Sequence, residues 1–107
     1  MSPTHLEPPY YIVTFSYKYG QNLEGYAAMD EETLNAVKKI DGFIGYESVK
    51  TPEKTIFISY WRDITAIELW KNDALHLQAK IMGKSQWYQW YHVQIAKVEQ
   101  NIFHTNE

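Results

Sequence analysis

The sequence contains no cysteine among its 107 residues. That absence excludes disulfides, thiolate nucleophiles, iron–sulfur clusters and cysteine-type zinc sites, and it fits a reducing compartment. The four histidines are scattered, with no H-E-x-x-H pattern or other recognisable ligand spacing, so we expect no resident metal. They are His5, His76, His92 and His104.

Runs of basic residues and long apolar runs are also lacking. Ten basic residues against thirteen acidic ones leave a formal net charge of -3, so a phosphate backbone would find little to bind. No window approaches the roughly 20 apolar residues that a membrane-spanning helix needs. Residues 1–9 show no charged start followed by an apolar stretch, as a secretory signal would. We therefore expect a soluble cytoplasmic protein that binds neither nucleic acid nor membranes.

Aromatic side chains, in contrast, are abundant. They make up 16% of the chain, as nine Tyr, four Trp and four Phe, and all four tryptophans lie in the second half. Large flat side chains with a polar tip suit cores, interfaces and pockets for flat ligands alike. The length of the chain is that of one domain with one core.

The first half of the chain predicts a strand, a helix and a strand. Residues 1–9 carry three prolines and favour an extended, mobile arm ahead of a single domain over residues 10–107. Residues 10–19 alternate β-branched and aromatic side chains and predict the first strand. From about Tyr26 the apolar spacing predicts a helix of about fourteen residues, ended by Asp41-Gly42. Residues 43–51 then predict the second strand.

The second half predicts a strand, helical segments and a final strand. Residues 55–61 close a hairpin with the preceding strand across a short turn. Asp63 is a good N-cap for a helix running through Trp70, and Asp73 for a further segment that stops at Gly83. Residues from 87 to about 101 predict a long last strand. The order is β-α-β-β-α-β, an α+β fold of the ferredoxin-like, split βαβ type with an antiparallel sheet.

The predicted strands carry apolar or aromatic side chains on both faces, although the two helices cover only one. Phe57 and Trp61 lie on the face opposite Ile56, Ile58 and Tyr60. A second copy of the sheet is the economical cover for the other face, so we predict a homodimer. The alternative is a tyrosine-rich sheet whose hydroxyl groups are hydrated.

A set of short motifs follows in fixed order along the chain. They are Tyr10-Tyr11 with Phe15, Gly25-Tyr26, Gly42-Phe43-Ile44-Gly45, Ser59-Tyr60-Trp61, Ala66-Ile67 with Trp70-Lys71, His76, Gly83 and Trp87-Tyr88. Over about residues 10–103 this pattern resembles the antibiotic biosynthesis monooxygenase family. The resemblance implies a dimeric α/β barrel and the oxidation of a polycyclic or quinol-type aromatic by molecular oxygen without a cofactor. Asp41 departs from the family's usual proline before Gly42, which affects only the turn.

Oxygenation without a cofactor requires a flat pocket and a base, because the substrate itself supplies the electrons. Candidate substrate-binding residues are Phe15, Trp61, Trp87 and Tyr91, and candidate catalytic residues are His76 and Trp70. Each tryptophan taken alone is more often a core residue than a pocket residue. His76 is a candidate base because histidine exchanges a proton near neutral pH. The alternative interpretation is that His76 lies on a helix and faces solvent. His92 is better explained by a structural role across strands.

Two other functions fit the same sequence. One is a haem-binding or haem-degrading protein on this fold, in which His76 is an axial ligand of the iron. The other is a dimeric module that binds a hydrophobic metabolite without turning it over. The leading hypothesis is the enzyme, with an aromatic small molecule and oxygen as its partners and with no cofactor.

Overall fold

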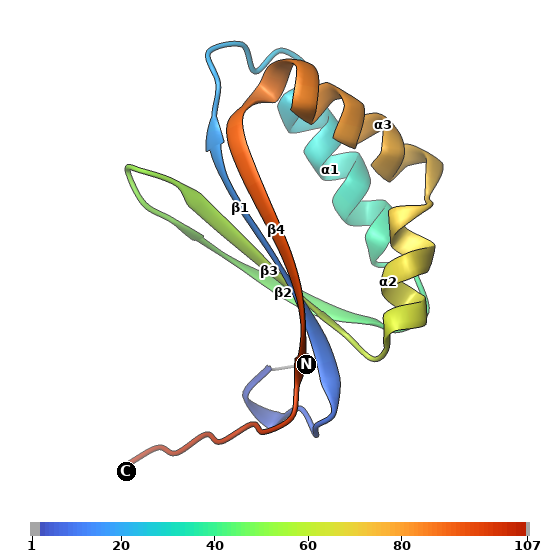
Figure 1. Ribbon diagram of the computed structural model, residues 1–107, viewed down its shortest axis with the longest axis vertical. Coiled ribbons are helices and arrows are strands. Elements are labelled where there is room, and N and C mark those ends of the chain that lie inside the picture. Colours follow the sequence, from blue (N-terminus) through green and yellow to red (C-terminus); the bar gives the residue numbers. More distant parts are fainter. Residues whose placement is uncertain (1–2, 107) are drawn as a thin grey trace.

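The computed structural model describes residues 3–106 as an antiparallel sheet with helices against one of its faces (Figure 1). The chain forms β1 (Tyr10–Tyr19), α1 (Tyr26–Val37), β2 (Phe43–Lys50), β3 (Thr55–Trp61), α2 (Ile64–Lys71), α3 (Ala74–Met82) and β4 (Tyr88–Val98). A short 3-10 turn, Pro3–His5, precedes β1, and a π-helical turn, Gly83–Trp87, joins α3 to β4. The ferredoxin-like α+β fold predicted from the sequence is confirmed.

The strands lie in the order β2-β3-β1-β4, and each neighbouring pair is antiparallel. The register sets Phe15 of β1 opposite Phe57 of β3 and Val93 of β4. Because side chains alternate along a strand, Val13 and Tyr17 point to the same face as Phe15. That is the face the helices cover.

Glycine and aspartate set the ends of the helices. Gly25 at the start of α1 and Gly42 before β2 have φ angles of 80° and 100°, which favour glycine. Asp63 caps α2 by accepting a hydrogen bond from the backbone N–H of Ala66 at 2.9 Å. Asp73 does the same for α3, where its carboxylate lies 3.3 Å from the backbone nitrogen of His76. Both predicted caps are therefore present.

Two predicted boundaries differ from the structure. α1 ends at Val37 rather than near Asp41, because the chain tightens into i to i+3 hydrogen bonds at Lys39 and Ile40 before it reaches Gly42. β4 begins at Tyr88 rather than at Trp87, because Trp87 ends the π-helical turn. The last strand is also shorter at its far end, where pairing with β1 stops at Val98.

The core lies at one end of the space between helices and sheet. Its fully buried members are Val37, Trp61, Ala66 and Ile67. Only 1% of Trp61 is exposed, its indole N–H donates to the Ser59 hydroxyl at 2.8 Å, and its ring meets Phe43 edge-on. The indole N–H, the polar atom of this buried side chain, is thus paired inside the protein.

The described part of the predicted N-terminal arm lies beside the segment that follows β4. The Asn101 amide donates to the backbone oxygens of Leu6, at 2.8 Å, and Thr4, at 3.4 Å. Residues 1 and 2 of the arm lie outside the described residues, and its mobility stays a prediction. Among residues 3–106, no helix is both long enough and apolar enough to span a membrane.

Candidate functional site

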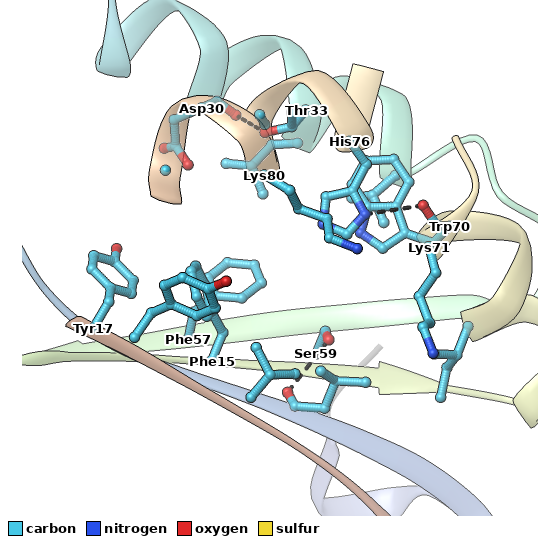
Figure 2. Close-up of a pocket in the computed structure, with 18 of the residues that line it drawn as sticks. Phe15, Tyr17, Asp30, Thr33, Phe57, Ser59, Trp70, Lys71, His76 and Lys80 are labelled. Atoms are coloured by element: carbon cyan, nitrogen blue, oxygen red, sulfur yellow. Dashed lines mark hydrogen bonds between the residues drawn. The ribbon is translucent and has the colours of Figure 1, made fainter. Parts of the chain in front are cut away.

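A cavity of about 340 Å³ lies between the helices and the sheet, next to the core. Side chains from β1, β3, β4 and all three α-helices line it (Figure 2). Its volume falls in the range of small-molecule sites, which runs from about 300 to 1,000 Å³. On β4, Tyr91, Val93 and Ile95 line the cavity and are also exposed to solvent.

His76 lines the cavity in an orientation that fixes its tautomer. Its Nδ1 lies 3.0 Å from the backbone oxygen of Trp70. Because a carbonyl oxygen only accepts hydrogen bonds, Nδ1 carries the proton and donates it to that oxygen. The Nε2 of the neutral ring is then unprotonated and able to take up a proton.

The surroundings of His76 keep the ring neutral at physiological pH. Burial lowers the pKa of His76 below its ordinary value of about 6.5, and the hydrogen bond to Trp70 opposes that shift. The positive charge of Lys80 lowers the pKa further, and Asp73 raises it. The lowered pKa leaves His76 as an available base rather than an imidazolium ion.

Trp70 holds His76 in place by two contacts. Its backbone oxygen accepts the Nδ1 hydrogen bond, and its indole stacks on the imidazole with ring centroids 4.4 Å apart and planes 9° from parallel. The indole also lines the cavity and packs against the core. Trp70 therefore joins the rigid core to the candidate base.

Two lysines line the same end of the cavity. Figure 2 shows the Lys80 side chain reaching toward the rings of His76 and Trp70. Lys71 follows Trp70 in α2 and forms an exposed ion pair with Glu68 at 3.5 Å. Their positive charges favour a negative charge that develops on a molecule held beside His76.

Tyrosines form the other end of the cavity. The hydroxyl groups of Tyr17 and Tyr26 lie 3.3 Å apart, and the ring of Tyr88 lies 4.8 Å from that of Tyr17. Burial is the main cause of the raised pKa of each of the three, and it raises the pKa of Tyr88 to about 12. All three phenols are therefore neutral at physiological pH and act as hydrogen-bonding groups.

Gly83 makes room for the ring of Tyr88. A Cβ atom at residue 83 would lie 2.8 Å from the nearest ring carbon of Tyr88, closer than such atoms approach without something shifting. Gly83 begins the π-helical turn, a distortion that often accompanies functional sites. Glycine at residue 83 thus allows the ring of Tyr88 to take its place in the wall of the cavity.

The structure brings together most of the residues that the sequence singled out. Phe15, Trp61, Trp70, His76 and Tyr91 line the cavity. Of these, Trp61 contributes chiefly to the core, since almost none of its surface is accessible.

Trp87 does not lie on the wall of the cavity, contrary to our expectation. Its ring meets the ring of Tyr26 edge-on, with ring centroids 5.4 Å apart. Its indole N–H donates to the backbone oxygen of Glu24 at 2.9 Å. Because that contact ties the π-helical turn to the segment before α1, Trp87 supports the pocket from outside.

Sequence reasoning missed several residues of the cavity. They are Tyr17, Tyr26, Asp30, Lys71, Lys80 and Tyr88. The two-residue period of β1, which sets Tyr17 on the face of Phe15, was a usable signal for one of them. For Asp30 and Lys80 there was none, because the pairing of α1 with α3 is set by tertiary packing.

Within the described part of the chain, no group of three or more His, Asp or Glu side chains is placed to hold a metal ion. The cavity instead combines aromatic walls, one candidate base and nearby cationic groups. That arrangement is suited to binding a flat molecule and removing a proton from it.

Comparison with known proteins assigns the family. The model of the monooxygenase af470-like family matches residues 13–106. The chain belongs to that family. It is 39% identical over 102 residues to the uncharacterized protein YqjZ of Bacillus subtilis, a match that covers 94% of this chain and 90% of YqjZ.

A second relative is named for an activity. The chain is 30% identical over 66 residues to the jasmonate monooxygenase ABM of Pyricularia oryzae. That match covers 59% of this chain but only 31% of the longer protein.

Solved structures agree on the fold. SnoaB of Streptomyces nogalater, a cofactor-independent oxygenase, superimposes with a TM-score of 0.72 at 9% identity, covering 87% of this chain and 96% of SnoaB. Structures that bear the name antibiotic biosynthesis monooxygenase share the fold too. The family resemblance expected from the sequence is confirmed.

Proposed function

We propose that this protein is a cofactor-independent monooxygenase that acts on an aromatic small molecule of the polycyclic phenol or quinol type. The observation that carries the proposal is His76, whose ring is neutral, stacked on Trp70 and presented to an aromatic cavity with Nε2 free to accept a proton. Membership of a monooxygenase family and the fold shared with SnoaB support it. The cysteine-free sequence favours a reducing cytoplasmic location for the reaction.

The first step is removal of a proton from the substrate. Phe15 and Tyr91 hold the flat molecule, and Nε2 of His76 takes the proton from an acidic carbon or hydroxyl group next to the ring system. The charges of Lys71 and Lys80 stabilise the resulting anion.

The second step is the reaction with oxygen. The anion gives two electrons to molecular oxygen and a C–O bond forms, which leaves a peroxide anion that takes back the proton from the His76 imidazolium. The hydroperoxide then loses water to give a carbonyl group. A CH₂ group and O₂ are thereby converted into C=O and H₂O, with all four electrons supplied by the substrate.

Oxygen consumption with anthrone as the probe tests this function. His76→Ala should lower kcat by about 10²- to 10⁴-fold, the usual contribution of a general base. His104→Ala is the matched control, because His104 lies in the exposed segment after β4. Wild-type turnover should survive a metal chelator, and equal rates for His76→Ala and wild-type protein would refute the assignment.

The dependence on pH gives an independent readout. Since only neutral His76 accepts a proton and burial lowers its pKa, kcat/KM should rise with pH, with an inflection below the ordinary histidine value of about 6.5. Lys80→Gln should move that inflection to higher pH, because the charge of Lys80 lowers the pKa of His76. An inflection that ignores Lys80→Gln would argue against His76 as the titrating base.

Haem binding is the competing function. Histidines that ligate a metal usually donate their other ring N–H to a carbonyl or carboxylate oxygen, and His76 forms such a hydrogen bond through Nδ1. Titration with haemin separates the two. A shifted Soret band that His76→Ala abolishes would favour haem. Binding of anthrone without oxygen consumption would favour a module that only binds.

We also propose that two copies of the chain pair through the sheet face that carries no helix in the described structure (Figure 1). The register assigns to this face Ile12, Val49, Ile56, Ile58, Trp90 and Val98. Of these, Trp90 is 40% and Val49 53% exposed in the single chain. Apolar area of this kind is normally covered, and a second copy offers the same surface in return.

Sedimentation measures this pairing. The wild-type protein should sediment at about twice its 12.7 kDa mass at micromolar concentration. Ile58→Lys, beside Glu47 on the open face, should give the single chain. Leu69→Lys on the exposed side of α2 is the matched control and should still pair. A wild-type protein that sediments as one chain would refute the dimer.

A further inference from the structure

The cavity has two chemically different ends, of which the mechanism above uses only one. His76, Lys71 and Lys80 lie at the first end. Figure 2 shows Asp30 and Tyr17 facing each other across the other end, Asp30 from the helical side and Tyr17 from the sheet. A molecule that fills the cavity therefore meets a carboxylate at the end away from the candidate base.

Asp30 lies in the second turn of α1. Its backbone oxygen accepts a side-chain hydrogen bond, but among the described residues its carboxylate does not. The hydroxyl of Thr33 donates to the backbone oxygen of Asp30 at 3.0 Å. Within residues 3–106, no side chain or backbone group forms a hydrogen bond or ion pair with the Asp30 carboxylate. Its oxygens are thus free to accept from a ligand.

The lysines that line the cavity lie at its other end, and Figure 2 shows Lys80 directed toward His76 rather than toward Asp30. Burial raises the pKa of Asp30, and the positive charge of Lys50, which does not line the cavity, lowers it. The neighbouring phenols are neutral, and the charge of Asp30 helps to raise the pKa of Tyr88. Asp30 keeps contact with solvent, and a carboxylate without a protein partner gains from a ligand that donates to it.

We propose that Asp30 binds a hydrogen-bond donor, a hydroxyl or amino group, carried by the aromatic molecule at the end farthest from His76. The position of the reacting atom rests on the proposed function, whereas the preference for a donor rests on the cavity alone. Asp30 is then a specificity residue that selects substituted ring systems and fixes their orientation. One orientation presents the acidic carbon to Nε2 of His76, and the reversed one sets a donor group against the lysines.

Binding of anthraquinone probes tests the proposal without any turnover, because these molecules are already oxidised at the ring. The set consists of anthraquinones substituted at carbon 2 with hydroxymethyl, methoxymethyl or aminomethyl. The hydroxymethyl probe has an O–H donor, which the methoxymethyl probe replaces with O–CH₃. The aminomethyl probe has N–H donors and a positive charge. Quenching of tryptophan fluorescence reports binding, since Trp70 lines the cavity.

The hydroxymethyl probe should bind wild-type protein about tenfold more tightly than the methoxymethyl probe, as expected for a hydrogen bond to a charged group. The aminomethyl probe should bind at least as tightly. Asp30→Ala should bring the three affinities within about twofold of each other. Asp30→Asn keeps an acceptor oxygen but no charge, so it should spare part of the hydroxymethyl preference and abolish the aminomethyl preference.

Glu31→Ala is the matched control, because Glu31 is the adjacent acid on α1 and does not line the cavity. It should keep the wild-type order of affinities. An unchanged order in Asp30→Ala, or an equal loss in Glu31→Ala, would overturn the proposal. If anthrone is not oxidised while the probes still discriminate through Asp30, the oxygenase function fails and the donor site stands.

Discussion

The two ends of the space between helices and sheet are both rich in aromatic side chains, yet one end is packed solid and the other is hollow. At the packed end Trp61 is enclosed by Val37, Ala66 and Ile67. At the hollow end Tyr17, Tyr26 and Tyr88 surround part of a cavity of about 340 Å³. The abundance of aromatic residues therefore does not distinguish a core from a pocket.

What separates the two ends is where the polar atoms of the rings are directed. The indole N–H of Trp61 is satisfied by Ser59, a residue of the same strand. The hydroxyls of Tyr17 and Tyr26 lie 3.3 Å apart, interact with the hydroxyl of Tyr19 as well, and belong to side chains that line the cavity. A phenol can donate one hydrogen bond and accept two, so this group keeps capacity for a further hydrogen bond. A ring whose polar atom is paired internally can be buried completely, whereas rings with spare hydrogen bonds need water or a ligand beside them.

The largest expected effect comes from emptying the packed end. Trp61→Ala should lower the free energy of unfolding by about 3–5 kcal/mol, because it removes a fully buried indole and leaves a void. Urea denaturation monitored by circular dichroism measures the change. Leu69→Ala, at a residue that is 55% exposed, should cost less than about 1 kcal/mol and serves as the control.

A smaller loss of stability should follow when the packed end keeps its side-chain volume but loses one hydrogen-bond acceptor. Ser59→Ala deprives the Trp61 indole N–H of its acceptor. A buried donor without a partner costs about 1–3 kcal/mol, so the urea midpoint should fall while the slope stays unchanged. A loss below about 0.5 kcal/mol would show that the pairing of Trp61 does not matter.

The corresponding deletion at the hollow end should cost least. Tyr17→Phe removes the hydroxyl that faces Tyr26, but Tyr26 lines the cavity and can bond to water there, so we expect a loss below about 1 kcal/mol. The same denaturation experiment measures it. If Tyr17→Phe costs as much as Ser59→Ala, the distinction between the two ends is wrong.

Much of the fold was predictable because its signals are local. The alternation in β1 and the aspartate caps at Asp63 and Asp73 depend on residues close in sequence, and each appears where it was predicted. The end of α1 was less predictable, because the turn at Lys39 and Ile40 competes with one more helical turn.

The site was predictable only where a residue's chemistry stood out in the sequence. His76 could be chosen because few side chains exchange protons near neutral pH, and the structure sets it in the cavity. Trp87 was misplaced because its hydrogen bond to Glu24 joins segments far apart in sequence. Asp30 was overlooked for a similar reason, since nothing in the sequence distinguishes it from the adjacent acids of α1 and only the fold places it on the wall of the cavity.

The close approach of Tyr88 to Gly83 makes the size of the cavity depend on the absence of a Cβ atom at residue 83. Alanine at residue 83 would press on the phenol ring, and that ring touches Phe15, Tyr17, Tyr26 and Tyr91. A shift of one ring would therefore be passed to the whole aromatic wall. A larger residue at the start of this turn would therefore change the shape of molecule that the cavity accommodates without any change at His76.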